Sequence, residues 1–85
     1  MNQEELIAYQ TLCSIQANLL NVEIALSNKT ISRDTATKHI KQALILTDRL
    51  EKHTIAAPTV HEIKELSKLL LEKCNVAYSS LGMNR

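Results

Sequence analysis

Glycine and proline are almost missing from this chain, which has one of each among its 85 residues. Because these two residues mark turns and interrupt helices, their scarcity predicts long helices joined by short connections. Phe and Trp are absent and Tyr occurs twice, so the predicted core is built from Leu, Ile, Val and Ala. A phosphate-binding loop needs several glycines, which excludes the P-loop and the dinucleotide-binding fingerprint.

The net charge is close to zero, and one segment of the chain has no charged residue. The formal net charge is +1, which gives no electrostatic case for binding nucleic acid or an anionic membrane. From Leu6 to Val22 there is no Asp, Glu, Lys, Arg or His. A surface helix normally carries charge on its solvent face, and neutral amides and hydroxyls cost less to bury than charges do. The uncharged run therefore predicts a helix that another chain covers. It is too short and too polar to span a membrane.

The pattern of apolar residues predicts a single all-α domain. Three helices are expected, at about 3–27, 32–53 and 59–81. Short connections make successive helices antiparallel, so the expected architecture is an up-down-up three-helix bundle.

Capping residues set the expected helix starts. Ser32 is placed to cap the second helix. Pro58 disfavours helical conformation at Ala57, and Thr59 with Glu62 forms a T-x-x-E capping box, so the third helix is expected to begin there. The buried face of the second helix is predicted to be Ala36, Ile40, Ala43, Leu44, Thr47 and Leu50, with Ile45 exposed outside it.

The third helix is expected to end at Gly82 in the left-handed conformation, with Met83 contacting Tyr78. Leu69 and Val76 are predicted to form a second small stripe away from the core. The core face of this helix is predicted to be Ile63, Leu66, Leu70, Cys74, Ala77 and Leu81.

The first helix carries two apolar rows, separated by roughly 130–140° at about 100° per residue. The inner row has heptad spacing and consists of Leu12, Ile15, Leu19, Val22 and Leu26. The outer row consists of Leu6, Tyr9, Cys13, Ala17, Leu20 and Ile24. The inner row suits the internal core, and the outer row is the preferred association face. The alternative is that this helix is central and buries both rows against its neighbours.

Two modes of association are open. In one, the outer row is the seam, and Tyr9 is the best anchor because buried aromatics dominate interface energetics. In the other, an amide stripe packs against the partner, with Ile7 and Ala25 as apolar contacts. The amide stripe consists of Gln10, Ser14, Asn18 and Asn21. The expected function is a non-catalytic regulator, adaptor or inhibitor that binds a protein or forms a homodimer. Phages and mobile elements encode many small proteins of this kind.

A DNA-binding regulator and a structural subunit of a larger assembly are the alternatives. Residues 31–40 resemble the turn and recognition helix of a helix-turn-helix motif. Under that reading the residues that contact DNA are Lys29, Ser32, Arg33, Thr35 and Lys38.

No catalytic constellation is expected, because the three histidines lack a converging nucleophile and orienting group. His53, His61 and Glu65 form the one arrangement with metal-ligand spacing, and solvated polar residues are the preferred interpretation. Neither a cofactor nor a small-molecule substrate is expected. Cys13 and Cys74 are expected to be reduced, although a disulfide between them stays open, and no signal peptide is recognised, so the expected location is cytoplasmic.

Overall fold

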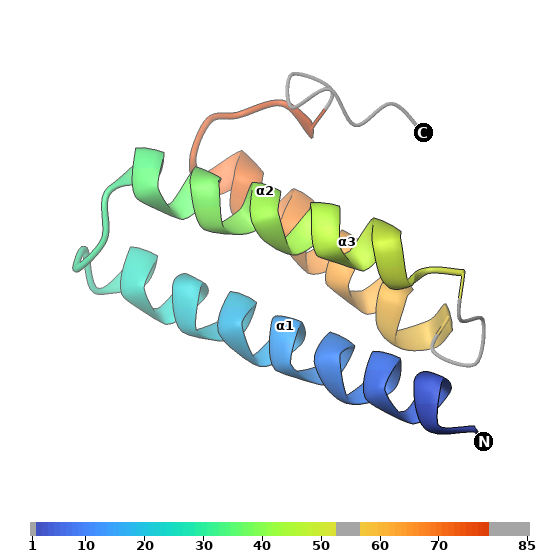
Figure 1. Ribbon diagram of the computed structural model, residues 1–85. Coiled ribbons are helices and arrows are strands. Elements are labelled where there is room, and N and C mark those ends of the chain that lie inside the picture. The colour runs from blue at the N-terminus through green and yellow to red at the C-terminus, as the bar shows by residue number, and fades with distance from the viewer. Residues whose placement is uncertain (1, 53–56, 79–85) are drawn as a thin grey trace.

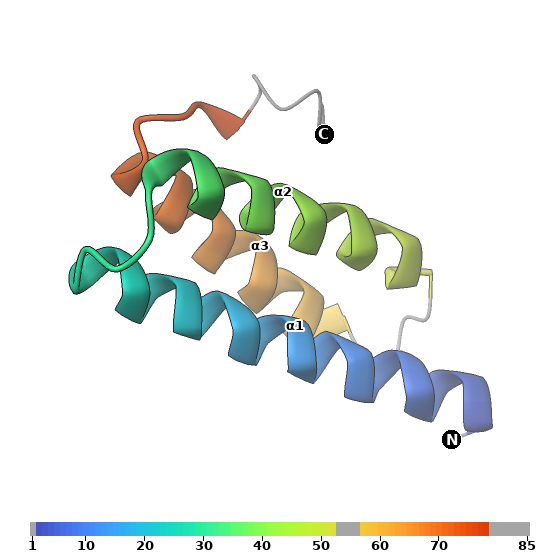
Figure 2. The same cartoon turned by 60° about the vertical axis from the view of Figure 1, so that its left-hand side comes forward.

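A computed structural model describes residues 2–52 and 57–78 of the chain. It forms three packed helices, α1 (Gln3–Ser27), α2 (Arg33–Leu50) and α3 (Ala57–Lys73), with no strand in the described part. α2 runs antiparallel to α1, and α3 returns in the direction of α1 (Figures 1 and 2). The predicted all-α, up-down-up three-helix bundle is therefore confirmed.

Both ends of α1 agree with the predicted range, and local hydrogen bonds explain them. At the start, the N–H of Glu5 donates to Oδ1 of Asn2 at 2.8 Å, and the N–H of Asn2 donates to Oε1 of Glu5 at 3.4 Å. This capping box satisfies N–H groups that the first helical turn leaves unpaired. At the end, Lys29 is left-handed with φ 58°, and the N–H of Thr30 donates to the carbonyl of Ala25 at 2.9 Å. This is a Schellman termination formed without glycine.

Ser32 caps α2 as predicted, because its Oγ accepts the N–H of Thr35 at 3.2 Å. The helix ends at Leu50, slightly before the predicted end, and Glu51 is its C-cap residue. Lys52 follows in a turn, and the last predicted residue, His53, lies outside the described part of the chain.

The predicted start of α3 is wrong by two residues, since the helix begins at Ala57 and includes Pro58. Proline is compatible with the first turn of a helix, where its fixed φ is already helical and its missing N–H has no partner to lose. Thr59 and Glu62 therefore lie inside the helix and do not mark its beginning.

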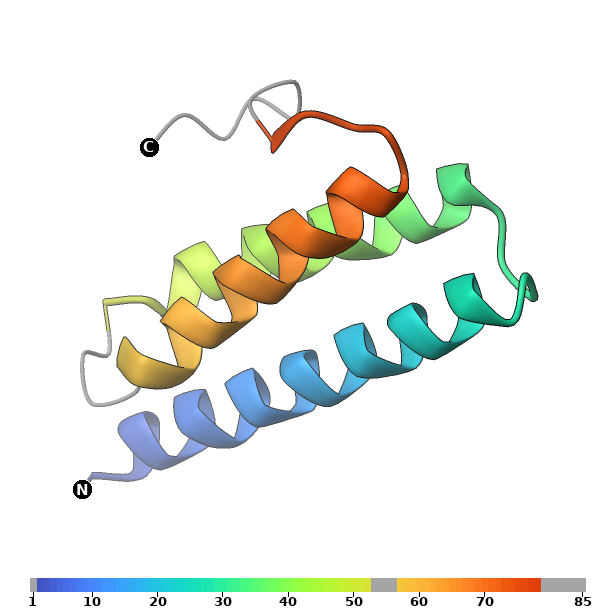
Figure 3. The same ribbon diagram turned by 180° about the vertical axis from the view of Figure 1, so that it is seen from behind.

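The predicted end of α3 is wrong by a larger margin, because the helix ends at Lys73. Asn75 takes the left-handed conformation with φ 60°, and its N–H donates to the carbonyl of Glu72 at 3.0 Å. The N–H of Val76 donates to the carbonyl of Leu71 at 3.0 Å, which completes a second Schellman termination. The chain then turns back over the bundle (Figure 3). The predicted stop and its apolar contact, at residues 82 and 83, lie outside the described residues.

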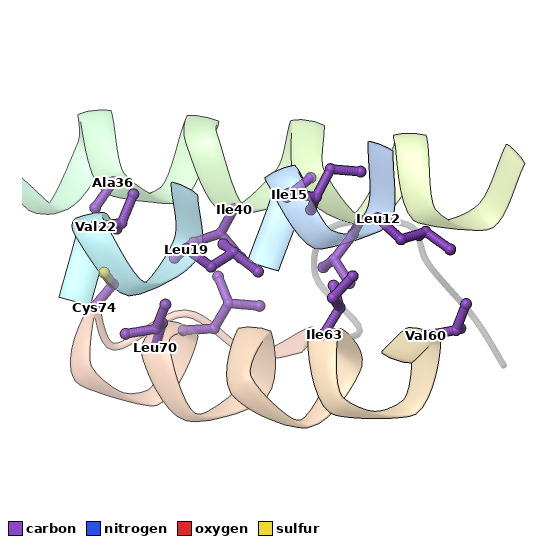
Figure 4. Close-up of a cluster of buried hydrophobic side chains, with 13 residues drawn as sticks. Leu12, Ile15, Leu19, Val22, Ala36, Ile40, Val60, Ile63, Leu70 and Cys74 are labelled. Carbon is purple, nitrogen blue, oxygen red and sulfur yellow. The ribbon is translucent and has the colours of Figure 1, made fainter. Parts of the chain in front are cut away.

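The core lies between the three helices and is aliphatic, as predicted. The inner row of α1 points into it, with four members buried and Leu26 partly buried (Figure 4). Ala8 extends this row by one turn and is fully buried. The predicted face of α2 is confirmed, with Leu50 partly buried at its end, and Ile45 is exposed as expected.

The predicted buried face of α3 is confirmed at Ile63, Leu70 and Cys74, with Leu66 partly buried, but the buried face is wider than predicted. Val60, Ser67 and Leu71 are buried although the spacing argument omitted them, whereas Ala77 is exposed beyond the end of the helix. The hydroxyl of Ser67 is tolerated in the core because it donates to the carbonyl of Ile63 at 2.7 Å.

The predicted stripe of Leu69 and Val76 does not form. Leu69 is 55% exposed, whereas Val76 follows the helix end and packs partly against the core. The two residues therefore face different surroundings, because the left-handed turn at Asn75 reverses the chain between them. Tyr78 also returns to the bundle, where Nζ of Lys68 lies 5.5 Å from the centre of its ring.

Candidate protein-interaction surface

The outer row of α1 lies on the molecular surface. All six of its members are exposed, which answers the open question of which row is internal. Its four large members keep 41–57% of their area exposed: Leu6, Tyr9, Leu20 and Ile24. Exposed apolar surface that is contiguous on a small protein marks an interaction site more often than single exposed residues do.

Polar contacts between α1 and α3 form one border of this row. Nε2 of Gln16 donates to Oε2 of Glu62 at 2.8 Å, and Nζ of Lys73 lies 3.6 Å from Oε2 of Glu23. Leu69 is seven residues after Glu62 and four before Lys73, so it shares their face of α3, and its side chain is 55% exposed.

Tyr9 is anchored at this border by its neighbours. Cys13 lies one turn along the same helix, and its side chain raises the pKa of Tyr9 through hydrogen bonding and through the charge of its thiolate. Desolvation and the Glu62 carboxylate raise this pKa by smaller amounts. Tyrosine is neutral at physiological pH with or without this shift, and its amphipathic ring suits a residue that another chain covers.

The amide stripe lies on the other side of α1, where Asn18 and Asn21 line a groove between α1 and α2. The groove has a volume of about 480 Å³. Its floor is aliphatic, and His39 and Gln42 of α2 face the two asparagines across it. Gln10 and Ser14 are exposed farther toward the start of α1 and do not line the groove. The amide stripe is therefore split: two of its members line the groove, and the other two lie on open surface.

The residues proposed for DNA binding lie at three separate places. Ser32 and Thr35 are engaged in the cap of α2, where the Ser32 hydroxyl donates to Oγ1 of Thr35 at 2.9 Å. Lys29 and Arg33 line a second pocket of about 350 Å³ at the end of the bundle. Lys73 of α3 lines the same pocket. Its presence there could not be predicted from the sequence, because only the packing of α3 beside α1 brings Lys73 to the pocket. Lys38 is exposed and does not line this pocket.

Among the described residues, no three His, Cys, Asp or Glu side chains are grouped closely enough to hold a metal ion. Nε2 of His61 lies 3.9 Å from Oε1 of Glu65, and both side chains are largely exposed. Cys13 is exposed and Cys74 is buried, and both are free thiols. None of the described helices is long and apolar enough to cross a membrane.

The exposed outer row combines large apolar side chains with a helix that carries no charge from Leu6 to Val22. The groove and the basic pocket lie at other positions around the bundle. No protein-family model matches this chain, and no curated protein or solved structure matches it either.

Proposed function

We propose that this protein is a non-catalytic interaction module that binds a protein through the outer row of α1, as a regulator, adaptor or inhibitor does. The observation that carries the proposal is the exposure of four large apolar side chains along one face of a helix whose opposite face already fills the core. The inner row of α1 fills the core, so the fold does not require the apolar side chains of the outer row. Two free thiols favour a reducing, cytoplasmic location.

The physical argument rests on desolvation. Covering the outer row removes apolar surface from water and buries no charge of α1 between Leu6 and Val22. Tyr9 stands at the border with an amphipathic ring, the residue type enriched at interface hot spots. Neighbouring Glu62 and Lys73 lie outside the apolar row and supply a polar rim.

The test compares one Leu substitution with one Ile substitution, and each introduces a glutamate. Leu20→Glu places a carboxylate in the outer row, and Ile45→Glu places one on the exposed side of α2, where Ile45 is 37% exposed. Binding is measured by sedimentation velocity over a concentration series and by quantitative capture of proteins from an extract of the source cells. Circular dichroism checks that both variants keep their helices.

We expect Leu20→Glu to weaken association at least 10-fold and Ile45→Glu to leave it unchanged, because only the first charge must be desolvated on binding. The proposal is wrong if the two variants bind every partner as the wild type does. It is also wrong if the wild type stays monomeric and retains no protein from the extract.

DNA binding is the second candidate, and the pocket that joins Lys29, Arg33 and Lys73 is the observation that favours it. Against it, α1 and α2 run antiparallel as long helices, whereas the two helices of a helix-turn-helix motif cross at about 90–120°. Binding to duplex DNA should weaken steeply with salt and be lost in Arg33→Ala with Lys38→Ala. Unchanged duplex mobility at low salt would remove this candidate.

A further inference from the structure

We infer that the groove between α1 and α2 binds an amphipathic helix of a protein partner, and that the flank of this helix beside α2 carries acidic residues. The groove is a different surface from the outer row of α1, so the inference goes beyond the proposed function and gives the chain a second binding site. Three observations carry it: the chemistry of the lining, the shape of the groove and the charges along its edges.

The lining of the groove is apolar or neutral. None of the described residues that line it is Asp, Glu, Lys or Arg. Buried aliphatic side chains of both helices form the floor, and Leu46 stands beside them with 42% of its area exposed. The neutral polar groups of the lining can both donate and accept hydrogen bonds: Asn18, Asn21, His39 and Gln42. Such a lining suits an apolar helix face that has polar residues at its borders.

The shape of the groove favours a helix as the occupant. The groove lies between two antiparallel helices (Figure 1), and its lining on α1 extends over ten positions, from Ile15 to Ala25. This is about 15 Å, or about three turns of a second helix. The backbone groups along both walls are bonded within α1 and α2, so an extended strand finds no backbone partner there, whereas a helix satisfies its own. α3 packs against the other side of the same two helices, so the occupant would complete a four-helix arrangement.

The edge of the groove on α2 is cationic. Lys38 lies four residues before Gln42 and Arg49 lies seven after it, so the three side chains share one stripe along the helix. Both cations are exposed. Asp34 and Lys41 lie seven residues apart on the next stripe outward, and their opposite charges leave that stripe without net charge. The edge beside the groove therefore attracts acidic side chains of an occupant.

The other acidic residues of α1 and α2 leave this cationic edge uncompensated. Asp48 and Glu51 lie 3.6 and 3.0 Å from Nζ of Lys64 on α3, away from the groove. On α1, Glu23 is paired with α3, and the two glutamates of the first turn lie ten or more residues before the groove begins. An occupant therefore meets positive charge along α2 and a neutral edge along most of α1.

The test uses two synthetic helical peptides of about 18 residues that share one Leu and Ile face. One peptide carries Glu at the positions flanking this face, and the other carries Lys there. Isothermal titration at low salt measures their binding to the full chain. We expect the Glu peptide to bind at least about fivefold more tightly, because the cationic edge attracts it and repels the Lys peptide. Lys38→Glu with Arg49→Glu should reverse this preference.

Two glutamate substitutions at leucines of similar exposure separate the groove from the outer row. Leu46 lines the groove and is 42% exposed, and Leu20 lies in the outer row and is 46% exposed. Leu46→Glu should weaken binding of the Glu peptide at least about 10-fold, and Leu20→Glu should leave it unchanged, because only the first charge must be desolvated by the peptide. Failure of the proposed function would appear elsewhere, as an association through the outer row that Leu20→Glu does not weaken.

Equal affinity for the two peptides would overturn the inference, and so would binding that Leu46→Glu leaves unchanged. Failure of both peptides to bind at millimolar concentration would also overturn it. Self-association of the wild type that Leu46→Glu abolishes would assign the groove to a second copy, which contradicts an acidic helix as its occupant.

Discussion

Nε2 of Gln16 donates a hydrogen bond to Oε2 of Glu62 at 2.8 Å and thereby joins α1 to α3 at the edge of the core. On one side of this contact the residues of α1 are buried, and on the other side the outer row begins. The pair is therefore a boundary between the surface that folding uses and the surface that folding leaves open.

Tyr9→Ala should weaken association without unfolding the chain. Truncating a hot-spot aromatic costs about 1–3 kcal/mol of binding free energy, which is roughly 5- to 150-fold in Kd. Tyr9 is 41% exposed in the isolated bundle, so the free energy of unfolding should change little. Isothermal titration or sedimentation equilibrium measures the first quantity and urea denaturation the second. A variant that loses helicity would show instead that Tyr9 supports the fold.

Cys13→Ala should lower the pKa of Tyr9. The hydrogen bond and the thiolate charge of Cys13 are the largest causes that hold this pKa above its ordinary value, and the substitution removes both. A raised folded-state pKa contributes stability that is complete below the unfolded pKa and is lost as the pH rises through the folded value. The wild type should therefore lose this contribution in alkaline solution, and the variant should lack it. Tyrosinate absorbance during an alkaline titration measures the shift, and identical titration curves would exclude the contact.

Lys29→Gly should stabilise the protein. Lys29 has a φ of 58°, a conformation that costs a residue with a Cβ about 1–2 kcal/mol and costs glycine almost nothing. We expect a gain of about 0.5–1 kcal/mol in the free energy of unfolding, measured by urea denaturation. Lys38→Gly is the matched control, because Lys38 lies inside α2 and glycine there should cost about 1 kcal/mol. Equal effects of the two substitutions would contradict the role of backbone conformation.

Ser67→Ala and Leu70→Ala should have very different effects although both residues are fully buried. The Ser67 hydroxyl donates to a carbonyl of its own helix, so removing it leaves no unpaired donor and the change should stay within about 1 kcal/mol. Leu70→Ala opens a cavity and should cost about 2–5 kcal/mol. Thermal and urea unfolding compare the two variants, and a loss at Ser67 as large as at Leu70 would show that the hydroxyl holds the core together.

The sequence was sufficient for features that depend on one helix alone. Heptad spacing identified the inner row of α1 as the core face, whereas the spacing left open whether the outer row is exposed or buried against the neighbouring helices. The cap at Ser32 was also recognisable, because the hydroxyl and the N–H that it accepts are three residues apart.

The sequence does not predict features at positions that several residue types can occupy. Asn75 ends α3 in a left-handed conformation that glycine usually takes, so a prediction based on glycine places the end of the helix at Gly82. Pro58 predicts that the helix starts after it, yet the first turn of α3 includes this proline. Lys29, Arg33 and Lys73 line one pocket because of the position of α3 along α1. No local sequence pattern predicts that position.

The two apolar rows of α1 also bear on how the chain reaches its fold. A helix that is apolar on two faces can enter a forming core in two rotations, so the outer row competes with the inner row before packing is complete. The competition is unequal, because the outer row has Cys13 and Ala17 at its centre, where the inner row has Ile15 and Leu19. The rotated arrangement would leave a void at the middle of the core. The larger side-chain volume of the inner row at the midpoint of α1 thus favours the native bundle over the arrangement in which α1 is rotated.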